Sequence, residues 1–126
     1  IRIADVVVIE GPAYSAHGSG TWDRAGLWAA VIDTVDHLKI PYLDIPPTKA
    51  KQFAAGKGNA DKTAVAAGIT RLWGDHVTPA NDNEFDAVAL ASLAAIHYAG
   101  RQLPIRILER HREVVSSIDW PQLRHQ

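Results

Sequence analysis

The feature that most constrains this chain is a short apolar run close to its start. Val6, Val7, Val8 and Ile9 follow one another without a polar residue. A continuous β-branched run is typical of a strand buried on both faces of a parallel sheet, so we predict a strand over residues 3–9. A buried strand needs neighbours, and few further strands are predicted. Because the sequence also starts without Met, we expect that N-terminal strands of the natural protein lie outside it.

The order of the elements after this run predicts the α/β class. Helical periodicity and strand signals predict helices over residues 21–39, 47–55, 61–73, 82–98 and 106–116, and a second short strand over residues 40–45. Strands that alternate with helices favour an α/β layer fold. With 126 residues, we expect one domain over 1–126, of which 101–126 form a C-terminal extension.

Composition excludes several classes of protein. A content of 47% hydrophobic and 21% charged residues excludes a disordered tail or a coiled coil. The absence of cysteine excludes disulfide scaffolds, thiolate zinc sites and cysteine nucleophiles. No apolar stretch approaches the length of a membrane-spanning helix, so we expect no membrane partner. The net charge of −1 gives no overall basic footprint for nucleic acid, although a local patch is compatible with it.

A first candidate site residue is Glu10, which ends the apolar run and is followed by Gly11 and a proline. Ligands of open α/β sheets bind at the carboxyl ends of the strands. Glu10 is therefore a candidate ligand or catalytic carboxylate. A solvated carboxylate in a turn is an equally good interpretation.

A second candidate group is Asp82, Asn83 and Asp86, which share one face at the start of a predicted helix. Oxygen ligands of this type suit Mg²⁺ or Mn²⁺ better than zinc. The alternative is N-terminal capping by Asp82 or Asn83, which we favour for Asp82 over a ligand role. Capping fits Asp86 less well, because it lies one turn further in. Apolar side chains downstream predict that this helix packs on the core: Ala87, Leu90, Ala91 and Ala94.

A third candidate group consists of four lysines around a glycine-rich turn: Lys49, Lys51, Lys57 and Lys62. The segment 56–63 superficially resembles a phosphate-binding P-loop, but Asp61 stands where the motif requires glycine. Binding of nucleic-acid phosphates by these lysines is the better functional interpretation. A solvated surface run is at least as good an interpretation of the lysines taken alone.

The loop after Glu10 contains Tyr14, which could stack on an unpaired base or simply pack on the loop. The same loop contains Ser15 and Ser19, but no His and Asp partners are arranged around them as a hydrolase triad requires. The six histidines show no metal-ligand spacing. The loop therefore contributes Tyr14 as its candidate nucleic-acid contact.

Taken in order, these pieces resemble the RuvC-like Holliday junction resolvases of the RNase H-like superfamily, most closely those of actinobacteriophages and their hosts. The resemblance covers about residues 3–98 and consists of four pieces: the strand that ends in Glu10-Gly11-Pro12, the small-residue helix segment 24–27, the Pro-Lys-Gly-Gly-Lys pattern over 47–62, and the Asp-Ala helix 83–90. It implies an RNase H-like fold, with a central mixed sheet flanked by helices. The family's N-terminal hairpin, which carries the first catalytic Asp, is absent from this sequence.

The resemblance also implies roles for individual residues. Glu10 and Asp86 match carboxylates that hold two Mg²⁺ or Mn²⁺ ions in the family. Asn83 stands where the family often carries Asp or His, and Asp82 is a possible substitute ligand. Lys51 and Lys62 match lysines near the DNA backbone and the cleavage site, where Lys62 would offset the charge of the phosphate. Lys49 and Lys57 extend this DNA-binding group. Tyr14 lies near the position of an aromatic residue used at the junction centre.

The function implied is that of a metal-dependent, structure-selective endodeoxyribonuclease that cuts branched DNA such as four-way junctions. The family also dimerises, and the helix over 21–39 is the candidate interface through Ala25, Gly26 and Ala29. The expected location is the cytoplasm of a bacterium or of a phage-infected host. Alternatives are a general RNase H-like nuclease, a non-catalytic junction-binding or scaffold module, and an α/β domain that binds a small ligand. The absent Asp and the presence of Asn83 point to the scaffold module.

Overall fold

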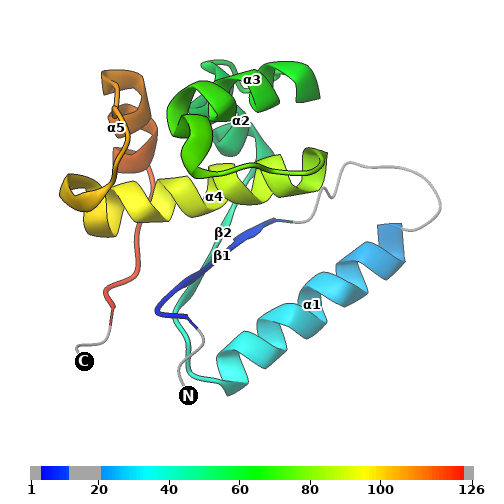
Figure 1. Cartoon of the computed structure of the whole chain (residues 1–126). Coiled ribbons are helices and arrows are strands. Elements are labelled where there is room, and N and C mark those ends of the chain that lie inside the picture. The colour runs from blue at the N-terminus through cyan, green and yellow to red at the C-terminus, as the bar shows by residue number, and fades with distance from the viewer. Residues whose placement is uncertain (1–3, 12–20, 124–126) are drawn as a thin grey trace. The chain divides into compact units, whose positions relative to one another are not determined.

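The computed structural model describes residues 4–11 and 21–123, without the side chains of residues 21–25. Within these residues, two strands and five α-helices follow one another (Figure 1): β1 (Val7–Glu10), α1 (Thr21–His37), β2 (Tyr42–Ile45), α2 (Pro47–Ala55), α3 (Lys62–Trp73), α4 (Asp82–Ala99) and α5 (Glu109–Ser116). Short 3₁₀ turns, Gly74–His76 and Gly100–Gln102, follow α3 and α4. The order confirms the predicted α/β class.

The chain divides into two compact units, each of which is described by itself. We call Ile1–Pro46 with Trp120–Gln126 the sheet unit, and Pro47–Asp119 the helical unit. The sheet unit contains β1, α1 and β2, and the helical unit contains α2 to α5. The expectation of one domain over residues 1–126, with 101–126 as an extension, stays a prediction.

In the sheet unit, β1 and β2 pair in parallel, with Val7 opposite Tyr42 and Glu10 opposite Ile45. Parallel strands need a crossover connection, and α1 lies in the segment between them. The strand predicted over residues 3–9 begins at Val7, and residues 1–3 lie outside the described part. The expectation that this strand is fully buried is wrong, because Val7, Val8 and Ile9 are half-buried. In the described part of the chain, β1 has one strand neighbour, β2.

Helix α1 ends at His37, two residues before the predicted end. Lys39 adopts a left-handed conformation with φ of 60°. The Lys39 N–H donates to the Asp36 carbonyl at 3.0 Å, and the Ile40 N–H donates to the Val35 carbonyl at 3.2 Å. These two bonds form the pattern that closes many helices at their C-terminus. The chain leaves the helix at this turn and enters β2.

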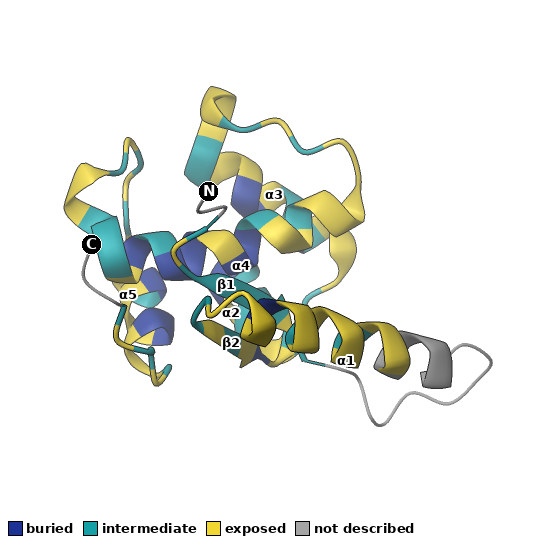
Figure 2. Cartoon of the chain, turned by 90° about the horizontal axis from the view of Figure 1, so that it is seen from below, coloured by how far each residue is buried: buried dark blue, intermediate teal, exposed yellow. Residues whose placement is uncertain are grey.

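The helix predicted over residues 21–39 carries one apolar stripe by its spacing, and this stripe is only partly buried: Trp28, Val31, Ile32, Val35 and Leu38. Val35 is buried, and Trp28 and Ile32 are half-buried. Val31 and Leu38, two members of this stripe, are exposed, as is Leu27. Figure 2 shows most of the described length of α1 in the colour of exposed residues. The expectation fails because consecutive helical residues such as Val31 and Ile32 lie about 100° apart and because Leu38 follows the end of the helix.

The helical unit is built around a close contact between α2 and α3. An added Cβ atom on Gly68 of α3 would lie 1.7 Å from the carbonyl oxygen of Ala54 in α2, so the two backbones touch at this point. Helix α2 also contacts α4 and α5, and Figure 1 shows α2 and α3 on α4 with α5 near its C-terminal end. Phe53, Ile69 and Leu93 are almost fully buried at the centre.

Polar contacts connect the helices of this unit. The Trp73 indole N–H donates to Ser92 Oγ at 2.8 Å, which links α3 to α4. The Arg110 guanidinium lies 3.5 Å from the carbonyl oxygen of Phe53, in the last turn of α2. His111 is buried in α5, and its Nδ1 accepts from the Leu108 N–H at 3.0 Å. The helix predicted over residues 106–116 therefore begins at Glu109, where this hydrogen bond caps it.

Helix α4 packs on the core, as predicted, but with a different face. Leu90 and Ala94 are buried, whereas Ala87 and Ala91 are exposed. The buried face also contains Ala89, Ser92, Leu93 and Ile96. The face is broader because α2, α3 and α5 all contact this helix. In the described part of the chain, no helix is long and apolar enough to cross a membrane.

Candidate functional site

The start of α4 is capped by Asn81. Its side-chain oxygen accepts from the Glu84 N–H at 3.0 Å, and the Glu84 carboxylate accepts from the Ala80 N–H at 3.3 Å. The interpretation that Asp82 or Asn83 caps this helix is therefore wrong. The spacing Asn81-x-x-Glu84 is the sequence signal that would have located the cap. Since capping is done by other residues, the side chains of Asp82 and Asn83 are available for another role.

The start of α3 lies beside the start of α4. Asp61 caps α3, because its Oδ1 accepts from the Ala64 N–H at 2.8 Å, and the helix begins at Lys62. Capping also explains why Asp61 stands where a P-loop has glycine. Lys62 Nζ lies 3.7 Å from Asp82 Oδ2 in the first turn of α4. Both side chains are exposed to solvent, by 83% and 55% respectively.

Asp86 lies one turn after Asp82 on the same face of α4. Burial raises the pKa of the Asp86 carboxyl, and the negative charge of Asp82 raises it further. The positive charges of Lys51 and Lys62 act on the same pKa in the opposite direction. Three helices therefore contribute side chains to one group, which we call the acid–lysine cluster: Lys51, Lys62, Asp82 and Asp86. A cation bound here would favour the ionised form of Asp86.

The other predicted lysines lie outside this cluster. Lys49 donates to Ser117 Oγ at 2.7 Å, just after α5. Lys49 and Lys51 point in different directions because residues two apart on a helix lie about 200° apart. Lys57 is exposed in the turn between α2 and α3, where its carbonyl accepts from the Ala60 N–H at 3.2 Å. The assignment of Lys49 and Lys57 to DNA binding stays a prediction.

Glu10 ends β1 at the carboxyl edge of the parallel pair, as predicted, and is exposed. The Gly11 N–H donates to the Ile45 carbonyl at 3.1 Å, so the pairing continues past Glu10. Glu10 belongs to the sheet unit and Asp86 to the helical unit. A joint metal site of these two carboxylates stays a prediction. Tyr14 lies outside the described residues.

The oxygen donors of α4 fit a hard divalent cation in their chemistry. Asp82 and Asp86 offer carboxylates, and Asn83, exposed three residues before Asp86, offers an amide oxygen. Within residues 4–11 and 21–123, no group of three or more His, Cys, Asp or Glu side chains gathers closely enough to hold a metal ion. A metal site would thus need further ligands besides Asp82 and Asp86.

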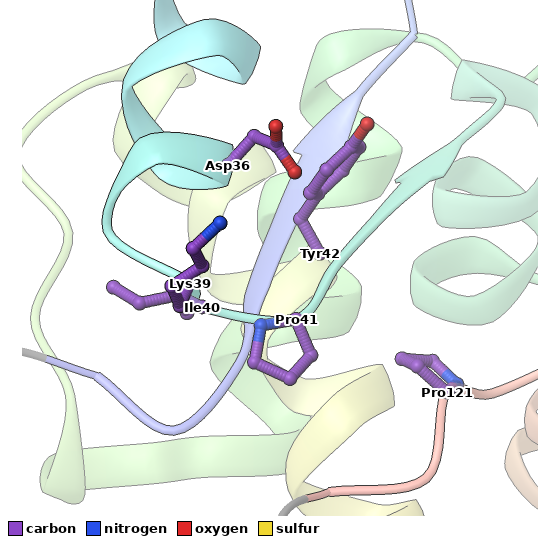
Figure 3. Close-up of a pocket in the computed structure, with 6 residues that line it drawn as sticks. All are labelled: Asp36, Lys39, Ile40, Pro41, Tyr42 and Pro121. Atoms are coloured by element: carbon purple, nitrogen blue, oxygen red, sulfur yellow. The ribbon is translucent and has the colours of Figure 1, made fainter.

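A hollow of about 370 Å³ in the sheet unit is not indicated by the sequence. Figure 3 shows the residues around it: Asp36, Lys39, Ile40, Pro41, Tyr42 and Pro121. Tyr42 stands opposite Val7, at the other end of the strand pair from Glu10. The hollow is therefore separate from the carboxyl edge. Pro121 is distant in sequence from its other lining residues, so no local pattern would have predicted it.

The chain is similar to known proteins in part of its sequence and in its fold. No protein-family model matches the chain. Over 61 residues, 48% of the chain, it is 34% identical to the crossover junction endodeoxyribonuclease RuvC of Synechococcus sp. (strain WH7803), and the match covers 40% of that protein. The structure of Thermus thermophilus RuvC matches with a TM-score of 0.60 and 24% identity, over 76% of this chain and 58% of that one. The chain thus spans about half the length of these relatives. It shares the fold of the Thermus thermophilus RuvC structure, and about half of its sequence is similar to a RuvC sequence.

Proposed function

We propose that this chain belongs to a metal-dependent, structure-selective endodeoxyribonuclease that hydrolyses phosphodiester bonds in branched DNA such as four-way junctions. The acid–lysine cluster is the observation that carries the proposal. It combines the Asp86 carboxyl, whose pKa is raised, with Asp82, Lys51 and Lys62 in a chain with a RuvC-like fold. Carboxylates suit a divalent cation, and lysines suit the phosphates of the substrate.

In this proposal Glu10 and Asp86 are the principal metal ligands, and Asn83 and Asp82 are further oxygen donors. Two Mg²⁺ or Mn²⁺ ions, when bound, would supply an activated water and stabilise the leaving 3′-oxygen. Lys62 offsets charge on the scissile phosphate. The remaining proposed contacts to DNA come from four residues: Lys49, Lys51, Lys57 and Tyr14. The actinobacteriophage character and the bacterial or phage-infected cytoplasm belong to the same proposal.

We also propose that two copies pair through the helix predicted over residues 21–39. The exposed apolar side chains Leu27, Val31 and Leu38 support this proposal. The position beside Gly26 also supports it, because nothing lies within 4 Å of a Cβ atom built there. Sedimentation of the wild-type chain and of a Leu27→Glu variant tests the pairing. We expect a dimer that the charged side chain dissociates, whereas a wild-type monomer would contradict the proposal.

The test of the activity uses protein produced from the complete reading frame that encodes this chain. An end-labelled four-way junction and a matched linear duplex are incubated with Mg²⁺ or with EDTA. We expect metal-dependent cutting of the junction, which Asp86→Asn and Glu10→Gln abolish. Asp75→Asn is the matched control, because Asp75 lies in the turn after α3 and is exposed. The control variant should cut like the wild type.

Two outcomes would favour the alternatives. Equal cutting of the linear duplex would favour a general RNase H-like nuclease. Tight junction binding without cutting in any divalent ion would favour a non-catalytic junction-binding or scaffold module. Asn83 is the residue that supports this second alternative, because an amide is a weaker metal ligand than the carboxylate or imidazole that the resemblance implies at this position.

A further inference from the structure

The contact between Lys62 and Asp82 joins the first turns of two helices. Lys62 is the first residue of α3, Asp82 is the first residue of α4, and their charged atoms lie 3.7 Å apart. Neither residue caps its helix, since Asp61 and Asn81 do so. The ion pair is therefore not a by-product of helix capping. In the proposed function Lys62 binds a DNA phosphate, but in this structure its partner is the Asp82 carboxylate.

The position of Asp82 is one that a phosphate oxygen of DNA could take. It lies next to an ammonium group and at the start of α4, where the helix dipole favours negative charge. Lys62 is 83% exposed, so a phosphate can reach it from solvent. Exposed ion pairs are weak, and a phosphate that brings further contacts can displace the carboxylate. Asp82 and a DNA phosphate therefore compete for one lysine.

We propose that Asp82 is a positioning residue that holds Lys62 in the DNA-free protein and competes with DNA phosphates for it. The inference rests on the proposed function, because it takes DNA as the ligand of Lys62. Any DNA whose phosphate binds Lys62 must first displace Asp82, so the ion pair lowers the affinity for linear duplex and for junctions alike.

The charges of the acid–lysine cluster determine how Asp82→Asn should change the affinity for DNA. The acid–lysine cluster contains two lysines and two carboxylates, so its formal charge is balanced while Asp86 is ionised. An Asp82→Asn variant leaves one positive charge in excess and an unpaired Lys62. We expect this variant to bind both the linear duplex and the four-way junction about 3- to 10-fold more tightly at low salt. The gain should shrink as added salt screens the exposed charges.

The experiment measures equilibrium binding of labelled linear duplex and four-way junction by gel shift, in EDTA. Without divalent ions, a role of Asp82 as a metal ligand cannot produce the effect. Asp75→Asn is the matched control, because it removes one exposed carboxylate of the same unit from outside the cluster. It should change both affinities less than about 2-fold, the change we expect from a rim charge. Asp82→Glu, which keeps the carboxylate, should keep most of the wild-type affinity for both DNAs.

A double-mutant cycle with Lys62→Gln decides whether Asp82 acts through this lysine. We expect Asp82→Asn to change duplex affinity by less than about 1.5-fold when Lys62 is already Gln. An equal gain with and without Lys62, or no gain in the single variant, would overturn the inference alone. If the wild-type chain binds neither DNA, the proposed function fails and the inference fails with it.

Discussion

The two units of the chain differ in how they bury apolar side chains. The helical unit contains most of the buried apolar residues that the structure describes: Phe53, Ala54, Val65, Ile69, Ala89, Leu90, Leu93, Ala94, Ile96, Val114 and Val115. In the described part of the sheet unit, Val35 and Ile45 are buried, while Leu27 and Leu38 are exposed. Burial of apolar surface is the main stabilising contribution to folding. The helical unit therefore has a core of its own, and the described elements of the sheet unit have little.

The largest effect is expected when one glycine in each unit is replaced by alanine. Gly68→Ala places a methyl group on the backbone of Ala54, so α2 and α3 must move apart. We expect the free energy of unfolding to fall by more than about 3 kcal/mol, at the upper end of overpacking effects. Gly26→Ala in α1 meets nothing within 4 Å. It should raise helix stability by about 0.5–1 kcal/mol, because Ala is the better helix former.

Urea denaturation followed by far-ultraviolet circular dichroism measures both variants. If the two units differ in this way, the two substitutions change the free energy of unfolding in opposite directions. If Gly68→Ala unfolds at the wild-type urea concentration, the close contact of α2 and α3 is not needed for the helical core. A destabilised Gly26→Ala variant would show that α1 is covered at this position in solution.

The next largest effect is a pH dependence that arises in the helical unit. Burial, and to a smaller extent the positive charge of Arg110, lowers the pKa of His111 from an ordinary value of 6.5 to about 4. Between pH 6.5 and 4 the unfolded chain takes up a proton that the folded chain does not. Stability should therefore be complete above pH 6.5 and fall by about 1.4 kcal/mol per pH unit at most as the pH decreases, by roughly 3 kcal/mol in total.

Urea midpoints at pH 7, 5.5 and 4.5 test this dependence. His111→Asn removes the titrating group and should flatten the pH profile relative to the wild type, whatever its effect at pH 7. The matched control is His76→Asn, because His76 is exposed in the turn after α3. An unchanged slope in the His111 variant would assign the acid sensitivity to other groups.

A smaller effect concerns the start of α4. Asn81→Ala removes the acceptor of the Glu84 N–H and should cost about 1 kcal/mol of stability. Asp82→Ala, one residue later, removes no cap and should cost less than half as much. Thermal unfolding of the two variants compares them directly. Equal losses would mean that Asp82 also supports the helix start.

The smallest effect is expected in the sheet unit. Lys39 has a φ of 60°, which is unfavourable for a residue with a Cβ atom. Lys39→Gly removes this strain but increases the entropy of the unfolded chain, so we expect a net gain of about 0.5 kcal/mol. Hydrogen exchange at the Ile40 amide, which donates to the Val35 carbonyl, measures the local effect. Faster exchange in the variant would contradict it.

Much of the fold could be predicted from local patterns. The five helices, the two strands and the α/β class follow from hydrophobic period and from turn residues such as Pro47 and Gly56, and the element bounds differ by a few residues. Burial was predicted less well. Val31 and Ala91 are exposed although their spacing placed them on an apolar face. Periodicity identifies an apolar face, but the neighbours that cover it are set by tertiary packing.

The candidate site shows the same limit. Helical spacing correctly placed Asp82 and Asp86 on one face, and the charge of Asp82 acts on Asp86. The different directions of Lys49 and Lys51 follow from their spacing on α2, but their partners depend on which helices contact α2, so the run of lysines did not reveal them. The contact between Gly68 and Ala54 was missed for a similar reason. A glycine inside a helical pattern signals a close approach only when the opposite helix is known.

Trp73, which donates a hydrogen bond to Ser92, allows the unfolding of the helical unit to be followed by tryptophan fluorescence. The chain has four tryptophans, and Trp73 is the one that lies within Pro47–Asp119. Replacing the other three by Phe would leave one emitter, whose indole is half-buried and bonded to a buried hydroxyl. Its emission spectrum would then follow the melting of α3 and α4 and would carry no tryptophan signal from the sheet unit.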